Sequence, residues 1–189
     1  MQIRLATTDI QRDSVVDGEG IRSVIWTQGC SHNCEGCHNP TTHSFTAGYL
    51  VDVDKIKDKI KSLEGQDGIT LSGGDPMFQA KECAEIARYC HEIGLNVWCY
   101  TGFTYEELLK LSKNKPEIMD LLSNIDVLID GKFILKEKSF DVKFRGSKNQ
   151  RVIDVPKSLS KNQVCLKEGY DNNVEKEEVT TNRKKYMFV

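Results

Sequence analysis

The chain has 189 residues, a formal net charge of −2 and 39% hydrophobic residues, which suits one folded domain and is short for two. This charge balance excludes a strong overall attraction to nucleic acid or to anionic lipid. No apolar run approaches the roughly 20 residues that cross a bilayer, and residues 1–4 begin no signal-peptide core. We therefore expect a cytoplasmic protein with no membrane and no nucleic-acid partner. The seven cysteines are an odd number, which excludes complete disulfide pairing within the chain.

Predicted strands and helices alternate along the chain. The hydrophobic pattern predicts strands at residues 23–28, 69–72, 95–100, 125–129 and 151–155. Helices are predicted at 52–63, with Asp52 as N-cap, then from Pro76 to about residue 93, and from Thr104 onward with an interruption near Pro116. Thr104 and Glu107 fit a capping box. This alternation predicts an α/β fold with parallel strands and crossover helices.

Unusual residues follow the predicted strands at their carboxyl ends. These are the cysteines after Gly29, then Gly73-Gly74-Asp75, Thr101-Gly102 and Asp130-Gly131-Lys132. Because the carboxyl ends of parallel strands share one edge of a sheet, and ligands bind there in α/β folds, we expect these four groups to converge.

Three cysteines, Cys30, Cys34 and Cys37, lie within eight residues. Their spacing would place them on one helix face, but the glycines and asparagines among them disfavour a helix and favour a loop around a metal. A zinc site would need a fourth ligand from one of three nearby histidines: His32, His38 and His43. A [4Fe–4S] cluster held by three thiolates leaves one iron open to a substrate. The spacing favours the iron–sulfur interpretation and leaves zinc as the alternative.

The remaining cysteines have a simpler explanation. Cys83 and Cys90 fall on the apolar stripe of a predicted helix, and Cys99 alternates with apolar residues in a predicted strand. We expect these three to pack in the core. The pattern around Cys165 predicts nothing specific.

Several motifs resemble known families. Cys30-x3-Cys34-x2-Cys37 is similar to the cluster motif of radical S-adenosylmethionine (SAM) enzymes. Residues 17–22, Cys37-His38-Asn39 and the glycine-glycine-acid-proline motif at 72–76 resemble the activases of glycyl-radical enzymes. Residues 126–133 and 144–151 resemble in particular the branch of activases that serves anaerobic ribonucleoside-triphosphate reductase. The resemblance covers about residues 14–155.

The resemblance implies a fold, an activity and partners. The fold would be a partial (βα) barrel of the radical SAM type over residues 1–156. Separately, the polar composition of the last twenty residues predicts that the C-terminal extension, 157–189, is partly mobile. The activity would be reductive cleavage of SAM at a [4Fe–4S] cluster, followed by hydrogen abstraction from a glycine of the reductase large subunit. A low-potential donor such as flavodoxin would supply the electron. No side chain would act as catalytic acid or base.

The resemblance also implies roles for individual residues. The three cysteines would bind the cluster, and Asp75 with the Gly73 and Gly74 carbonyls would accept hydrogen bonds from the SAM ammonium. Lys132 would face the SAM carboxylate, and Asp130 would hold a cation or the ribose. The remaining cofactor-binding candidates are His38, which would lie beside adenine, and Asn39, which belongs to the activase-like motif Cys37-His38-Asn39. Thr101 is the last candidate: related activases have an acid and a threonine at this point to hold a cation beside SAM, and this chain has Tyr100-Thr101 there.

Three positions differ from the pattern of these families. Glu19 stands where the activase signature has proline, Gly36 stands where many radical SAM enzymes have an aromatic residue, and Asp75 is one methylene shorter than the commoner glutamate. Residues 132–151 also carry seven basic side chains, which fit either a solvated loop or a docking surface for the reductase or an acidic electron donor.

Two other functions remain open at this point. A radical SAM enzyme acting on a small molecule, such as a deazapurine synthase, would share the cysteines and the glycine-glycine motif but would not account for residues 145–151. A non-catalytic zinc-binding module would share the cysteines alone.

Overall fold

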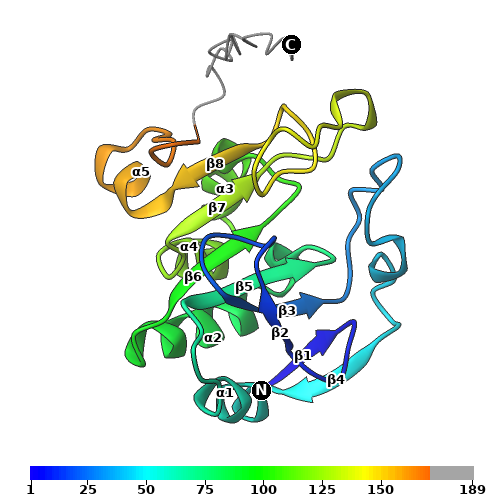
Figure 1. Ribbon diagram of the computed structural model, residues 1–189, viewed down its shortest axis with the longest axis vertical. Helices are drawn as coiled ribbons and strands as arrows, with labels where there is room; N and C mark the ends of the chain where they lie inside the picture. The colour runs from blue at the N-terminus through cyan, green and yellow to red at the C-terminus, as the bar shows by residue number, and fades with distance from the viewer. Residues whose placement is uncertain (171–189) are drawn as a thin grey trace, which may run out of the picture.

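The computed structural model describes residues 1–170, and they build a mixed α/β structure around an eight-stranded sheet (Figure 1). The strands follow the order β4-β1-β3-β5-β6-β7-β8. The remaining strand, β2, lies outside this order and pairs with β3. Their bounds are β1 (Gln2–Leu5), β2 (Gln11–Ser14), β3 (Arg22–Thr27), β4 (Tyr49–Asp52), β5 (Gly68–Gly73), β6 (Asn96–Tyr100), β7 (Val127–Asp130) and β8 (Arg151–Asp154).

The four central strands, β3, β5, β6 and β7, are parallel, as the sequence predicts. The outer strands are antiparallel to their neighbours: β1 and β2 to β3, β4 to β1, and β8 to β7. The expectation of a parallel strand is therefore wrong for β8. Residues 131–150 connect it to β7 through the short 3-10 helix η3 (Leu135–Glu137), without the crossover helix that a parallel connection requires.

The first helices begin near the predicted positions. They are α1 (Val53–Lys61), α2 (Ala80–Glu92), α3 (Tyr105–Leu111) and α4 (Pro116–Leu122), with 3-10 turns η1 (Pro40–Thr42) and η2 (Pro76–Gln79). The sequence analysis did not predict the last helix, α5 (Val155–Lys161). Asp52 accepts a hydrogen bond from the Asp54 N–H at the start of α1, and Thr104 and Glu107 form the predicted capping box. The helix predicted from Pro76 begins as η2 and continues as α2, whose 13 residues are too few to cross a bilayer; no helix within residues 1–170 is long and apolar enough to do so.

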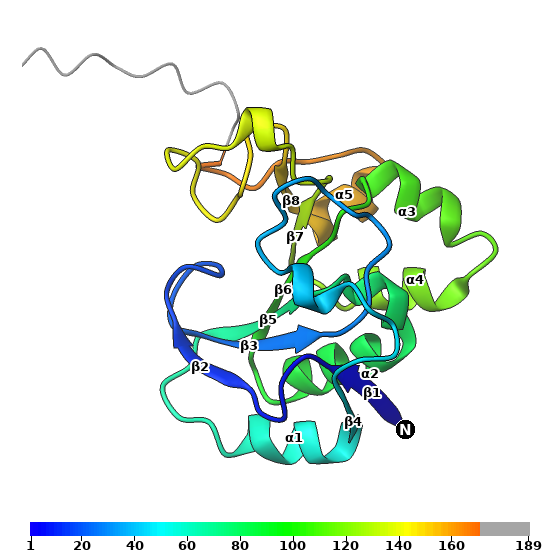
Figure 2. The same ribbon diagram turned by 90° about the vertical axis from the view of Figure 1, so that its right-hand side faces the viewer.

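The main core lies between the sheet and helices α1 to α4, which gather on one face (Figure 2). Cys83, Cys90 and Cys99 are fully buried there, which confirms their predicted place in the core. A smaller cluster on the opposite face joins Trp98 and Ile129 to Tyr170. The expectation of a mobile extension falls largely on residues 171–189, which lie outside the described residues.

Candidate functional site

The three clustered cysteines lie on the long loop that leads from β3 to β4. Cys30, Cys34 and Cys37 are half-buried, and none of them forms a disulfide. The backbone between them is not helical, and Asn33 and Gly36 have positive φ angles of 51° and 70°. This excludes the interpretation of the cysteines as one face of a helix. The three cysteines therefore lie on an irregular loop.

Backbone hydrogen bonds close the base of this loop. The Gly29 N–H donates to the Thr42 carbonyl at 2.8 Å, and the Cys30 N–H donates to the His43 carbonyl at 3.1 Å. The chain therefore returns to its starting point after the third cysteine. The segment that carries the cysteines is therefore a loop closed at its base.

The donor set of the loop fits an iron–sulfur cluster with three thiolate ligands. Within residues 1–170, no three His, Cys, Asp or Glu side chains already stand in an arrangement that could hold a metal ion. Burial raises the pKa of the Cys30 thiol to about 11. His32, one candidate fourth ligand for zinc, bonds through Nε2 to Asp75, and His38 packs against the Phe133 ring with centroids 4.7 Å apart. The hydrogen bond to Asp75 makes His32 unsuitable as a fourth ligand, and three thiols are the donors that the cysteine loop offers.

The end of β5 touches the chain immediately before the first cysteine. The Gly74 N–H donates to the Thr27 carbonyl at 2.7 Å, and the Asp75 N–H donates to the Gly29 carbonyl at 3.0 Å. A Cβ on Gly74 would lie 2.5 Å from the Gly29 oxygen, and one on Gly73, where φ is +105°, would lie 2.5 Å from the Thr27 oxygen. Glycine is therefore required at both positions for this close approach.

Asp75 connects three of the strand ends that the sequence predicts to converge. Its side chain is 1% exposed. Its Oδ2 atom accepts hydrogen bonds from His32 Nε2 at 2.7 Å, Thr101 Oγ1 at 2.9 Å and the Gly102 N–H at 2.9 Å. Its Oδ1 atom accepts from the Met77 N–H at 2.9 Å. The carboxylate thus joins the cysteine loop to the ends of β5 and β6.

The fourth group, Asp130-Gly131-Lys132, follows β7, and its aspartate forms hydrogen bonds within the protein. Asp130 is 1% exposed and accepts hydrogen bonds from Arg151 Nε at 3.0 Å and from the Tyr105 N–H at 2.8 Å. Arg151 also pairs with Glu106, and its hydrogen bonds to Asp130 and Glu106 raise its pKa. Lys132 is exposed, and within residues 1–170 no hydrogen bond or ion pair of its side chain is formed. Lys132 is therefore the cation of this group that a ligand can reach.

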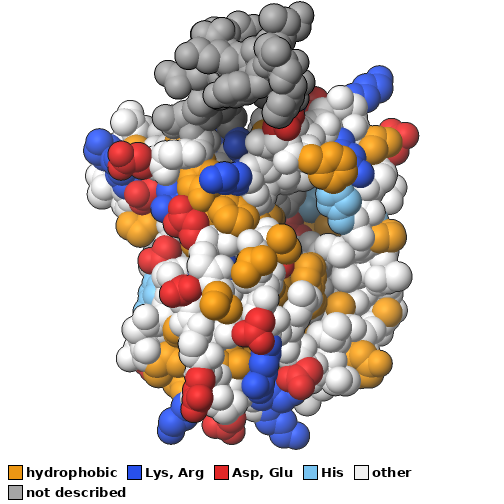
Figure 3. Space-filling model, viewed as in Figure 1, with side chains coloured by type: hydrophobic (Ala, Val, Ile, Leu, Met, Phe, Trp, Pro, Cys, Tyr) orange, Lys and Arg blue, Asp and Glu red, His pale blue; other side chains and the backbone are white. Residues whose placement is uncertain are grey.

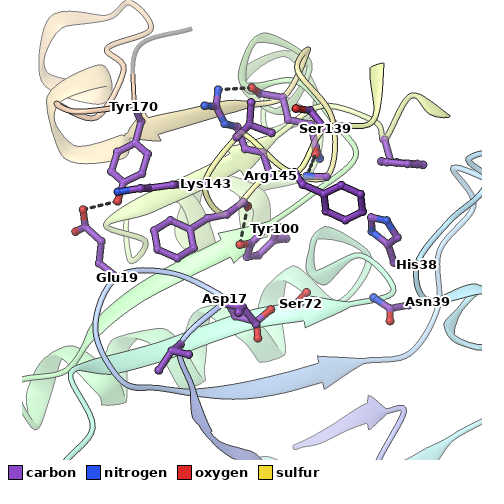
Figure 4. A pocket seen from close by; sticks show the side chains of 18 of the residues that line it. Asp17, Glu19, His38, Asn39, Ser72, Tyr100, Ser139, Lys143, Arg145 and Tyr170 are labelled. Atoms are coloured by element: carbon purple, nitrogen blue, oxygen red, sulfur yellow. Dashed lines mark hydrogen bonds between the residues drawn. The ribbon is translucent and has the colours of Figure 1, made fainter. Parts of the chain in front are cut away.

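A cavity of about 910 Å³ opens beside the cysteine loop (Figure 4). Its walls come from residues 15–20, from strands β3, β5 and β6, and from residues 139–146. His38 and Asn39 are the two predicted cofactor-binding residues that line it, together with Ser72 and Tyr100. Apolar side chains gather over the middle of the face seen in Figure 3. The walls of the cavity combine apolar and polar groups, as in pockets that bind small molecules or peptide segments.

The rim of the cavity is held by contacts between distant segments. Glu19 accepts a hydrogen bond from the Tyr170 hydroxyl at 2.7 Å and pairs with Lys167 at 3.1 Å. The Tyr100 hydroxyl donates to the Phe144 carbonyl at 2.8 Å. Glu19 stands where the activase signature has proline. The glutamate at this position therefore forms a contact with Lys167 and Tyr170 that a proline side chain could not form.

The basic segment 132–151 separates into two groups of side chains. Arg145 donates to the Gln150 carbonyl at 3.2 Å, and Arg151 pairs with Asp130, so both arginines anchor the segment. The lysines are exposed: Lys132, Lys136, Lys138, Lys143 and Lys148.

Sequence reasoning missed the role of His32, which it considered only as a zinc ligand. Its position between the first two cysteines was the available signal, but its partner lies 43 residues away in the sequence. Glu19 was noted only as a difference from a motif, and its partners lie about 150 residues away.

Comparison with known proteins identifies similar chains. A family model described as a 4Fe-4S single cluster domain matches residues 16–153. A protein of Haemophilus influenzae is 36% identical over 150 residues, which cover 72% of this chain and 89% of that protein. A protein of Enterobacteria phage T4 is 33% identical over 148 residues, covering 72% and 86%, and one of Escherichia coli K12 is 32% identical over 147 residues, covering 73% and 91%. Each of the three is named anaerobic ribonucleoside-triphosphate reductase-activating protein.

Proposed function

We propose a function for this chain from its family, since it belongs to the anaerobic ribonucleoside-triphosphate reductase-activating proteins. In this proposal the chain is an activase that generates a glycyl radical on that reductase. The observation that carries the proposal is the loop of three free cysteines at the edge where the four parallel strands end, beside a cavity of about 910 Å³. The family indicates the reductase as the target, and the cysteine loop offers a place for the metal cluster that the reaction needs.

Cys30, Cys34 and Cys37 are the residues that would hold a [4Fe–4S] cluster. Three thiolates leave one iron without a protein ligand, which is the position that SAM would occupy. When bound, the cluster would supply one electron for the cleavage of SAM to methionine and a 5′-deoxyadenosyl radical, which would remove a hydrogen atom from a glycine of the reductase. The protein supplies orientation and exclusion of water.

We propose that SAM extends from the cysteine loop along the ends of β5 and β7. The Gly73 and Gly74 backbone lies directly beside the base of the loop, and Lys132 offers an exposed ammonium to the SAM carboxylate. His38 and Asn39 line the cavity on the side of the third cysteine, where adenine would lie. Thr101 and Asp130, whose polar groups bond within the chain, would keep the ends of β6 and β7 in place.

The surroundings of the cavity suit a protein substrate. The sheet with helices on one face supports a partial (βα) barrel of the radical SAM type, with residues 1–156 as its domain and 157–189 as an extension. An open barrel side would admit the glycine-bearing segment of the reductase large subunit. The five exposed lysines of residues 132–148 offer a surface for that subunit or for an acidic low-potential donor such as flavodoxin. The free cysteines fit a reducing compartment, the cytoplasm.

The test is a reaction under anaerobic conditions with SAM, a reductant and the reductase. We expect 5′-deoxyadenosine and a glycyl radical on the reductase, detected by electron paramagnetic resonance. A variant with Cys34→Ala serves as the control and should produce neither. Cleavage of SAM with modification of a small molecule, and no radical on the reductase, would contradict the proposal.

A further inference from the structure

His32 joins the cysteine loop to the edge of the sheet. Its Nε2 atom lies 2.7 Å from Asp75 Oδ2, and the two side chains are 7% and 1% exposed. Because an ionised carboxylate only accepts hydrogen bonds, His32 is the donor. A buried hydrogen bond therefore runs from the middle of the cysteine loop to the residue that connects β5 and β6.

Packing fixes the His32 ring in the orientation that this hydrogen bond needs. The ring meets the Phe103 ring edge-on with centroids 4.5 Å apart, and the Phe78 ring lies 5.9 Å away. On its other side, a Cβ on Gly102 would lie 2.4 Å from the His32 Cδ2 atom. Glycine at position 102 thus leaves the space that the ring occupies.

The Asp75 carboxylate is engaged by donors of the chain in this arrangement. Its Oδ2 atom accepts from three donors, His32, Thr101 and Gly102, and its Oδ1 atom accepts from the Met77 N–H. At 1% exposure, the side chain also has almost no surface that SAM could touch.

We propose that Asp75 and His32 form a positioning pair that holds the cysteine loop against the sheet, and that Asp75 supports the cluster through His32 without contacting the ammonium of SAM. This inference rests on the proposed function for the identity of the cluster. It assigns His32 a role in the site, and it differs from the sequence-based expectation for Asp75.

Removing the donor of the pair should loosen the loop. The His32→Leu variant keeps a side chain of comparable bulk and has no donor, whereas His32→Gln keeps an N–H that can reach the carboxylate. In cluster-free protein, we expect amide hydrogen exchange of residues 30–39 to increase about tenfold in His32→Leu, the effect of losing one hydrogen bond to a charged group. His32→Gln should restore most of the protection.

The same variants, loaded with iron under anaerobic conditions, test the effect on the cluster. We expect His32→Leu to release iron to a chelator about tenfold faster than the unchanged protein. Asp75→Asn should also speed the release, and the double variant should be no faster than the faster single one, because both changes break one contact. The affinity of the loaded protein for SAM should change less than about threefold in Asp75→Asn, well below the loss of a charged contact.

The chain provides a matched control in a second histidine–aspartate pair. His91 Nε2 lies 2.9 Å from Asp126 Oδ2 at the end of α2, away from the cysteine loop. His91→Leu should leave the exchange of residues 30–39 and the release of iron unchanged.

Two results would overturn the inference. One is unchanged hydrogen exchange of residues 30–39 in His32→Leu, which can be measured whether or not the chain binds iron. The other is a tenfold or greater loss of SAM affinity in Asp75→Asn with unchanged iron release, which would make Asp75 a ligand contact. Absence of iron in the unchanged protein would instead contradict the proposed function, so the two failures are distinguishable.

Discussion

The guanidinium of Arg22 lies over the indole ring of Trp98, with Cζ 5.3 Å from the ring centroid. Arg22 is fully buried and donates hydrogen bonds to Thr70 Oγ1, the Ile69 carbonyl and Asn96 Oδ1 at 2.7, 2.7 and 2.8 Å. Burial lowers its pKa to about 10, so it stays protonated at neutral pH. The arginine of the 17–22 motif thus joins β3 to β5 and β6, and its role is structural.

Arg22→Met should reduce the free energy of unfolding by about 3 kcal/mol, because the buried Thr70 hydroxyl and Ile69 carbonyl and the partly buried Asn96 amide lose a charged donor. Urea unfolding measures this change. Arg12→Met is the matched control: Arg12 is exposed on β2, and its replacement should cost less than about 0.5 kcal/mol. Equal effects of the two substitutions would show that the buried hydrogen bonds of Arg22 contribute nothing to stability.

Gly74→Ala should disturb the base of the cysteine loop. The added Cβ would lie 2.5 Å from the Gly29 carbonyl oxygen, so the backbone before the first cysteine must shift. We expect a loss of about 2 kcal/mol, typical of overpacking, and a lower iron content after anaerobic reconstitution.

Gly65→Ala is the control for this substitution. Gly65 has a positive φ of 68° and nothing within 4 Å of an added Cβ, so alanine there should cost about 1 kcal/mol of backbone strain and leave iron binding unchanged. Full iron content in Gly74→Ala would mean that the contact with Gly29 does not set the position of the loop.

We expect the cysteines to divide into cluster ligands and core residues, which substitution can separate. Cys34→Ala should abolish SAM cleavage and iron retention. Cys83→Ala should retain both and lose on the order of 1 kcal/mol of stability, because Cys83 is fully buried in the apolar core. Iron analysis and urea unfolding of both variants provide the measurement. Loss of iron from Cys83→Ala would contradict the assignment of the ligands.

Glu19 should give the stability of the protein a measurable pH dependence. Burial raises its pKa, but the hydrogen bonds from Tyr170 and Lys167 outweigh it, and the pKa lies below the ordinary value of 4.5. A carboxyl group with a lowered pKa in the folded state stabilises above its unfolded pKa, and this contribution is lost as the pH falls through the folded value.

Glu19→Gln should therefore lose stability at pH 7 by less than about 1 kcal/mol, since the side chain is 48% exposed and screened by solvent. The difference from the unchanged protein should shrink below pH 4.5, the ordinary value for this group. Urea unfolding at about pH 3 to pH 7 measures this difference in the free energy of unfolding. Glu64→Gln, at an exposed position, is the control. A difference that is constant with pH would exclude the ion pair as its source.

The sequence predicts those parts of the fold that depend on local patterns. The four parallel strands show short segments rich in apolar residues, and the caps at Asp52 and Thr104 are set by residues within one helical turn. Strands β1, β2 and β4 were missed, because they are only four residues long and form by pairing with distant segments. The direction of β8 depends on its connection to β7, which carries no strong pattern.

The position of the candidate site was predictable from the sequence, but its internal contacts were not. The spacing of the cysteines and the position of Gly73-Gly74-Asp75 after a strand are visible in the sequence, and the structure brings both to one edge. The hydrogen bond between His32 and Asp75 depends on how two loops meet in space, so no sequence spacing predicts it. The pairing of Asp130 with Arg151 depends in the same way on the antiparallel return of β8.

The central claim is that the three-cysteine loop binds a [4Fe–4S] cluster. The most direct test is quantification of iron, sulfide and zinc, with a visible spectrum, on protein prepared without oxygen. We predict a brown protein with about four iron and four sulfide per chain and no zinc. A colourless protein that contains zinc, or one in which a fourth side chain of the protein ligates the cluster, would contradict the account.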